Sequence, residues 1–319
     1  MSSSRLALTI ISSVMALGAG AACGQAYPNK PIRFISAGAG SGGDFVSRLV
    51  ARALTASFGR QVIVENHPSG VIVGDLTAKA APDGYSIMVY GSSVWNIALV
   101  QKAPYDPLKD FAPVGIVGSS PNVVLAHPTL PVKSIKDLIA LAKAKPGVLN
   151  YGSTGTGSSN HLAALLFKSM ARIDIVHVPY KDGATLTSDL VSGQVHMTFA
   201  NTSFAVPLMK SGRMRGIAVT SLKPTPLVPG LPTVADTGLP GYSSGALYVM
   251  FAPAKTPADI INRLSQETAR GVKQPEIMDA LLKAGVEPVG STPEELGATM
   301  KLEITRMGQL IKDAGLRTD

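Results

Sequence analysis

The chain has 319 residues, of which 45% are hydrophobic and only 16% are charged, which excludes an intrinsically disordered protein and allows one large domain or two ordinary ones. The net charge is +8, but the Lys and Arg residues are scattered and few aromatic residues lie among them, so no nucleic acid partner is expected. A mild positive charge of this kind suits a small anionic molecule.

The first 26 residues differ from the rest of the sequence. Arg5 is followed by an apolar run over 6–22, which is short for a membrane span, and small residues lead up to Ala26. This pattern predicts an export signal peptide over 1–26, cleaved near Ala26. Cys23 is the only cysteine, so the mature chain has neither a disulfide nor a thiol catalyst, and a lipoprotein signal that is cleaved before Cys23 is the alternative.

Short β-rich runs then alternate with helical patterns along the chain. Strands are expected at 31–37, 61–66, 86–93, 114–120, 121–127, 149–153, 173–180, 194–201, 215–221 and 246–253. Helices are expected at 44–59, 134–147, 160–171, 185–193, 256–273, 274–285 and 292–315. The alternation predicts an α/β architecture with parallel sheets, in two series that make two domains with a cleft between them.

Two stretches that precede expected helices are almost alike, SAGAGSGGDF over 36–45 and STGTGSSNHL over 153–162. A glycine-rich turn at a helix N-terminus exposes unpaired backbone N–H groups, and the helix dipole adds about half a positive charge there. Such a turn binds an anion without a cationic side chain, unless Ser and Thr simply cap the helix. The candidate ligand-binding residues in these loops are Gly40, Ser41, Gly42, Asp44, Ser153, Thr154, Gly155, Thr156 and Ser158.

A nucleotide is the competing interpretation of the first loop. GAGSGG over 38–43 fits the G-x-G-x-x-G pattern of dinucleotide-binding domains, and Glu65 ends the next expected strand. However, Asp44 places a carboxylate where a pyrophosphate would lie, and Asn160 stands in the second loop where the third glycine belongs. An exported protein also meets little NAD, so we expect no cofactor.

Further candidates follow other strands. Ser92, Ser93 and Trp95 come after the strand at 86–93, where the tryptophan either stacks on a planar ligand or packs in the core. Asn201 and Thr202 end the strand at 194–201 and either bind a ligand carboxyl group or cap the next helix.

The histidines do not form a metal-binding pattern. None of the five shows H-x-x-x-H spacing or a carboxylate cluster beside it, and no catalytic motif of a hydrolase or a phosphate-binding loop is present, so neither a metal nor a catalytic residue is expected. His161 differs from the others because it lies in the first turn after the second loop. There it either donates a hydrogen bond to a ligand in its neutral form or bonds to the local backbone.

Ten stretches, in order over nearly the whole chain after residue 26, carry a family resemblance. They are YPNKPIRFI, SGGDFVSRLVARAL, GRQVIVENHPSG, APDGYSIMVYGSS, APYDPLKDFAPV, LNYGSTGTGSSNHLAALLFK, HVPYKDG, DLVSGQVHMTF, SGRMRGIAVTS and LPTVADTGLPGY. With these, the sequence resembles the Bug-type substrate-binding proteins of tripartite tricarboxylate transporters.

The resemblance implies a two-lobed periplasmic-binding-protein fold of type II, with mostly parallel sheets flanked by helices and a ligand cleft between the lobes. Lobe 1 would comprise 27–124 and 223–319, and lobe 2 would comprise 125–222. The loops that match SAGAGSGGD and STGTGSS would hold a ligand carboxylate through backbone N–H groups and bound water.

The implied function is that of a periplasmic solute-binding protein, a monomer and not an enzyme, which captures a small organic carboxylate and delivers it to the membrane subunits of such a transporter. The sequence does not rank the di- and tricarboxylates, amino acids and aromatic acids that the family binds. YKDG replaces the usual YKG and brings Asp182 near the cleft, so contacts of Asp44, Asp182 and Trp95 with the ligand stay open. The alternatives are a ligand-sensing partner of a membrane sensor kinase and a periplasmic enzyme acting on carboxylates, for which His161 and Asp44 are the candidate bases.

Overall fold

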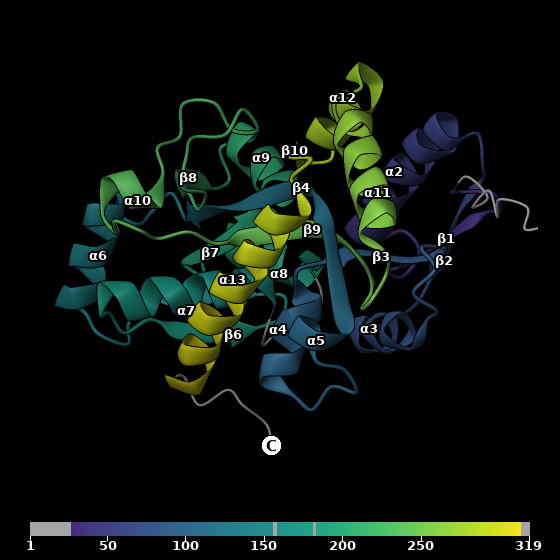
Figure 1. Ribbon diagram of the computed structural model, residues 1–319. Coiled ribbons are helices and arrows are strands. Elements are labelled where there is room, and N and C mark those ends of the chain that lie inside the picture. Colours follow the sequence, from purple (N-terminus) through teal and green to yellow (C-terminus); the bar gives the residue numbers. More distant parts are fainter. Residues whose placement is uncertain (1–26, 156–157, 181–182, 314–319) are drawn as a thin grey trace, which may run out of the picture.

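A computed structural model describes residues 27–155, 158–180 and 183–313 (Figure 1). Within these residues one mixed sheet runs through the molecule in the order β2-β1-β3-β9-β4-β7-β5-β6, and β8 and β10 also pair with β4. The strands are β1 (Ile32–Ser36), β2 (Val62–Asn66), β3 (Ser86–Gly91), β4 (Phe111–Ala126), β5 (Asn150–Ser153), β6 (Val176–Pro179), β7 (Met197–Asn201), β8 (Arg215–Val219), β9 (Gly245–Pro253) and β10 (Glu287–Pro288).

Helices cover both faces of this sheet (Figure 1). They are α2 (Gly42–Phe58), α3 (Gly70–Lys79), α4 (Ser93–Val100), α5 (Pro107–Asp110), α6 (Ile135–Ala144), α7 (Ser159–Ala171), α8 (Gly183–Ser192), α9 (Thr202–Lys210), α10 (Val234–Thr237), α11 (Ala258–Gly271), α12 (Pro275–Lys283) and α13 (Pro293–Asp313). The α/β architecture is therefore confirmed. Among the described residues, no helix is both long enough and apolar enough to cross a bilayer.

The direction of the strands differs between the flanks and the middle of the sheet. At one flank β1 pairs in parallel with β2 and β3, and at the other β5 pairs in parallel with β6 and β7. In the middle, β9 pairs antiparallel with both β3 and β4, and β4 pairs antiparallel with β7 and β8. The strand–helix alternation predicted the parallel flanks, whereas the antiparallel middle arises because β9 returns from far along the chain.

The long strand β4 joins the two parts of the sheet. Two strands were expected at 114–120 and 121–127, but the structure has a single strand there, in which Pro121 pairs with Gly245 of β9. From Asn122 onward β4 pairs with β7 and β8 instead. We call the part around β1–β3 the first lobe and the part around β5–β8 the second lobe. The exact lobe boundaries expected at 124/125 and 222/223 stay a prediction.

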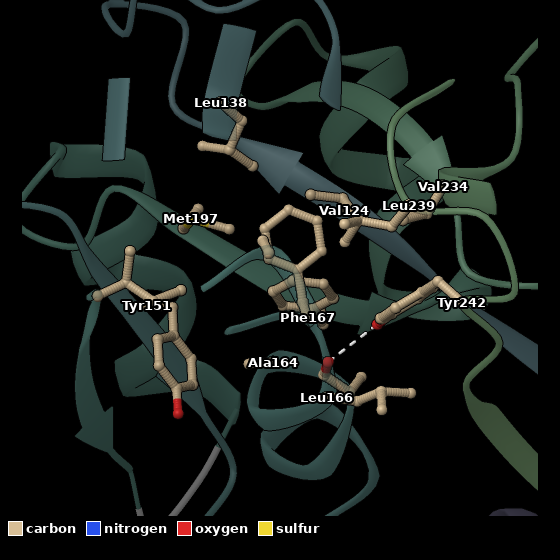
Figure 2. Close-up of a cluster of buried hydrophobic side chains, with 14 of the residues drawn as sticks. Val124, Leu138, Tyr151, Ala164, Leu166, Phe167, Met197, Val234, Leu239 and Tyr242 are labelled. Carbon is tan, nitrogen blue, oxygen red and sulfur yellow. Dashed lines mark hydrogen bonds between the residues drawn. The ribbon is translucent and has the colours of Figure 1, made fainter. Parts of the chain in front are cut away.

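Each lobe has apolar cores against both faces of its sheet. In the first lobe one core lies under α2, α11 and α12, and another under α3, α4 and the start of α13. In the second lobe one core lies under α6 and α7, where Phe167 packs beside Tyr242 (Figure 2), and another lies under α8 and α9. The Tyr242 hydroxyl donates a 2.9 Å hydrogen bond to the Ala163 carbonyl, which ties the segment before β9 to α7.

The last helix, α13, belongs to the cores of both lobes. Leu296 and Met300 near its start are buried in the first lobe, while Met307, Leu310 and Ile311 near its end are buried in the second. Figure 1 shows α13 crossing the molecule from one part of the sheet to the other.

Candidate functional site

The first glycine-rich loop is closed by its own side chains. Ser41 is the N-cap of α2, and its hydroxyl accepts a hydrogen bond from the Asp44 backbone N–H. The buried Asp44 carboxylate accepts from the Gly40 N–H at 2.9 Å and from the Asn66 amide at 2.8 Å, and it lies 2.8 Å from the Arg48 guanidinium. Asp44 therefore binds the loop to α2 and to the end of β2.

Asp44 is ionised at neutral pH in this environment. Burial alone would raise its pKa, but the hydrogen bonds from Gly40 and Asn66 and the charge of Arg48 outweigh burial, so the pKa of Asp44 lies below its ordinary value. The helix dipole of α2 is consequently matched by a negative charge that the protein itself supplies.

Gly42, at the start of α2, lies against β9 in the middle of the sheet. A Cβ at this position would lie only 2.7 Å from the hydroxyl oxygen of Tyr248 on β9. The first loop is thus held between β2 on one side and β9 on the other, and only glycine fits at position 42 without a shift.

The second loop has a different arrangement. β5 ends at the fully buried Ser153, whose hydroxyl bonds to both the N–H and the carbonyl of Gly155, a residue with φ +114°. The Ser158 hydroxyl donates to the same Gly155 carbonyl at 2.6 Å. In the described part of the chain, Ser158 precedes α7 without capping it through its side chain. The start of α7 carries no acidic residue in its first turn either, in contrast to α2.

Three stacked rings lie behind the second loop. The imidazoles of His161 and His177 stack with their centroids 4.0 Å apart, and Tyr151 stacks 5.0 Å from His177. His177 Nε2 lies 2.7 Å from the Ser153 hydroxyl, so the stack supports the loop. Burial, with His177 beside it, lowers the pKa of His161 to about 4, and burial together with Lys168 lowers the pKa of His177. Both imidazoles are therefore neutral at pH 7.

Two cavities open at the first residue of α7. The larger has a volume of about 670 Å³, and the smaller of about 80 Å³. The larger lies where the lobes meet and is lined by residues 91–93, 96, 119, 121, 158, 159, 162, 221, 222, 241, 243–247, 299, 302, 303, 306 and 307. The smaller lies within the second lobe and is lined by residues 154, 159, 160, 186, 198, 200, 201 and 204. Ser159 borders both, so the α7 N-terminus faces each of them.

These cavities bring together only some of the expected site residues. Ser92, Ser93 and Ser158 line the larger cavity, and Thr154 and Asn201 line the smaller. The described lining does not include Gly40, Ser41, Gly42, Asp44, Ser153, Gly155, His161 or Thr202. Thr156 and Asp182 lie outside the described residues.

Three of the site residues expected from the sequence have partners within the protein. Trp95 is 1% exposed and packs edge-on against Phe251, which corresponds to the core alternative. Asn201 caps α9 by accepting from the Phe204 N–H, and the buried Thr202 hydroxyl donates to the Gly285 carbonyl. By contrast, Ser92 lies at the cavity wall, where its N–H donates to the Leu247 carbonyl of β9.

Sequence reasoning missed one wall of the larger cavity. This wall is a face of α13, with Glu303 and Arg306 among its residues. The helical pattern over 292–315 showed that these side chains share a face, but the docking of α13 across both lobes is a tertiary contact that no local pattern reports. Among the described residues, no cluster of His, Cys, Asp and Glu side chains has the arrangement of a metal site.

Comparisons with known proteins agree with the overall fold. Residues 46–316 match TctC, the tripartite tricarboxylate transporter family receptor. The protein BugT of Bordetella pertussis is 31% identical, with 91% of each chain covered. The solved structure of R. palustris Rpa4515 with adipate is 32% identical at a TM-score of 0.74, covering 91% of this chain and 98% of the other. The periplasmic binding protein BugD is 29% identical at a TM-score of 0.71, covering 92% and 100%.

Proposed function

The chain belongs to the tripartite tricarboxylate transporter family of receptors, and from this premise we propose that it captures a small organic carboxylate in the periplasm and delivers it to the membrane subunits of such a transporter. Proteins of this family are substrate-binding receptors rather than enzymes. Export through a signal peptide over 1–26 and action as a monomer are parts of the same proposal.

The observation that carries the carboxylate is the start of α7. It borders both cavities at Ser159, Ser158 does not cap it through its side chain, and no acidic side chain of the first turn offsets the dipole, while Asn160 Oδ1 accepts from only one N–H group there, that of His161, among the bonds between described residues. Ser159 and Thr154 add hydroxyl groups beside this helix end. Such a site stabilises an anion without holding a fixed cation.

The size and lining of the larger cavity support a small ligand. A volume of about 670 Å³ lies within the range of roughly 300–1,000 Å³ that is typical of small-molecule sites. Serines from both lobes line it, so one ligand can contact Ser92 and Ser158 at the same time. Contacts to both lobes favour a closed arrangement of the two, and this is how binding is expected to be signalled to the membrane subunits.

A negative charge placed at the α7 N-terminus tests the proposal. Ser158→Asp places a carboxylate at the N-terminus of α7, where α2 already has the negative charge of Asp44, and should lower carboxylate affinity by at least about tenfold while leaving the fold intact. The matched control is Ser134→Asp, because Ser134 is the N-cap of α6 and lines neither cavity.

Isothermal titration of both variants and of the parent against a panel that includes adipate, malate, citrate and benzoate gives the result. Binding of none of these acids by the parent contradicts carboxylate capture. Equal affinity of the parent and Ser158→Asp contradicts the α7 site, and turnover of a bound acid, detected by mass spectrometry, contradicts the assignment as a receptor.

A further inference from the structure

One wall of the larger cavity carries charge that the carboxylate site at α7 does not use. Thr299, Leu302, Glu303, Arg306 and Met307 lie at helical spacing and form the face of α13 that lines the cavity. Among the lining residues described, Arg306 is the only cation and Glu303 the only anion. The charge of this wall therefore depends on how these two side chains are paired.

The pair leaves hydrogen-bonding capacity of the arginine unused. Arg306 Nη2 donates to Glu303 Oε1 at 2.6 Å, and each side chain is 27% exposed. Arg306 Nε is buried and has no hydrogen-bond partner among the described residues, and the same is true of Asn96 Oδ1 on the α4 wall. A guanidinium has five N–H donors, and an unpaired donor in a buried position costs free energy until it finds an acceptor.

A partly buried ion pair of this kind contributes little to stability by itself. Removing two charges from water costs about as much free energy as their attraction returns. Ligand binding therefore explains the presence of this pair better than stabilisation of the fold does. A carboxylate is the partner that a guanidinium binds best, because two parallel N–H···O bonds match its planar fork. Glu303 occupies one of these positions in the present arrangement and would be displaced by a stronger acceptor.

We propose that Arg306 is the subsite for the second acidic group of the ligand, with Glu303 as the counter-ion that this group replaces. This proposal rests on the carboxylate site at the α7 N-terminus, which lies on the same cavity through Ser158 and Ser159. The ligand class that follows is a dianionic acid with two separated acidic groups, one held at α7 and the other at α13. Leu162 and Met307 offer apolar contact to the part of the ligand between them.

A comparison of dicarboxylates with their monomethyl esters tests this inference. The ester keeps the length and shape of the acid but removes one negative charge, so the parent should bind adipate about tenfold more tightly than monomethyl adipate. Arg306→Gln should lose this preference and keep the affinity for the ester. The control is Arg270→Gln, which removes an arginine with the same i,i+3 pairing, to Glu267, on a helix that does not line the cavity.

A second variant covers the case in which Arg306→Gln does not fold. Glu303→Gln removes the competing carboxylate and should raise the affinity for adipate several-fold without changing the affinity for the ester. Unfolding monitored by circular dichroism checks each variant.

Retention of the preference in Arg306→Gln, or equal loss of both ligands by that variant, overturns the subsite while the parent still shows that a carboxylate binds. Failure of the parent to bind either ligand overturns the proposed function as well, so the two failures are distinguishable.

Discussion

The two glycine-rich loops share a sequence pattern and have different chemical environments. At the start of α2, Asp44 binds the loop N–H group and supplies the negative charge that the helix end favours. At the start of α7 no acidic side chain does so, and the helix end faces the cavities. A single carboxylate in the first helical turn thus distinguishes the two loops. The first loop is bonded to a side chain of its own helix, whereas the second loop can bind a ligand. Similar loops in one chain do not have to share a role.

The largest expected effect comes from removing the internal carboxylate. Asp44→Ala leaves the Gly40 N–H and the Asn66 amide without their acceptor and should lower the free energy of unfolding by about 4 kcal/mol, since each hydrogen bond to a charged group contributes about 1.5–3 kcal/mol and the pair with the exposed Arg48 adds little. Asp137→Ala is the control, because Asp137 makes the same bond to the N–H four residues earlier but is exposed. Urea unfolding of both variants measures the difference. Equal costs would contradict the special role of Asp44.

The loss of folding stability at acidic pH should arise in the second lobe, at His161. The pKa of His161 is about 4 in the folded protein against 6.5 in the unfolded chain, so the unfolded chain binds the extra proton first as pH falls. Stability is therefore fully present above pH 6.5 and decreases toward pH 4, by on the order of 3 kcal/mol at about 1.4 kcal/mol per pH unit.

Urea unfolding at several pH values measures how the free energy of unfolding changes with pH. His161→Phe keeps an aromatic ring in the stack but removes the titrating group, so it should flatten the dependence of stability on pH. The first loop does not contribute in this window, because the pKa of Asp44 is lowered from a value that is already acidic. A slope that His161→Phe leaves unchanged would place the acid sensitivity elsewhere.

Crowding at the first loop should be visible as a smaller effect. Gly42→Ala forces a methyl group against the Tyr248 hydroxyl and should cost about 2 kcal/mol, the range of overpacking. Tyr248→Phe removes the oxygen, so the double variant should recover most of the loss. Thermal unfolding of the double-mutant cycle measures this coupling, and additive losses would mean that the contact does not restrain the loop.

A glycine-to-alanine substitution in the second loop should have the smallest effect on stability. Gly155 has φ +114°, and a Cβ at this position would meet no atom of the described residues within 4 Å, so Gly155→Ala meets backbone strain but no clash. A cost of about 1 kcal/mol is expected, together with weaker carboxylate binding because the turn must relax. Titration beside thermal unfolding separates the two effects, and a loss of stability larger than that of Gly42→Ala would reverse the comparison.

Local features of the fold could be predicted from the sequence, and the pairing of distant segments could not. Ser134 caps α6 and Gly59 ends α2 in a left-handed conformation, as is typical of serine and glycine at helix ends. The helices α3, α4 and α9 were missed, since a glycine-containing stretch, a strand-end loop and a helix with an internal proline are weak local signals, and so were the four-residue helices α5 and α10. The position of β9 between β3 and β4 depends on contacts across more than a hundred residues.

The candidate site was predictable to a similar degree. The α7 N-terminus and Ser92 follow from strand–loop–helix spacing, because residues at strand ends gather at one edge of a sheet. The burial of Trp95 and the internal bonds of Asp44 depend on neighbours from other strands and helices, so the sequence left both roles open. The position of the α13 face at the cavity could not be predicted either, because it also depends on contacts with distant segments.

The anchoring of α13 in both lobes sets a limit on how the molecule can move. A stiff rod fixed at Met300 in one core and at Leu310 in the other keeps the distance between its attachment points nearly constant. Moving the lobes apart would expose its apolar residues to water, so α13 restricts their relative motion. Less orientational entropy is then lost on closure, and more of the ligand's binding free energy is available as affinity.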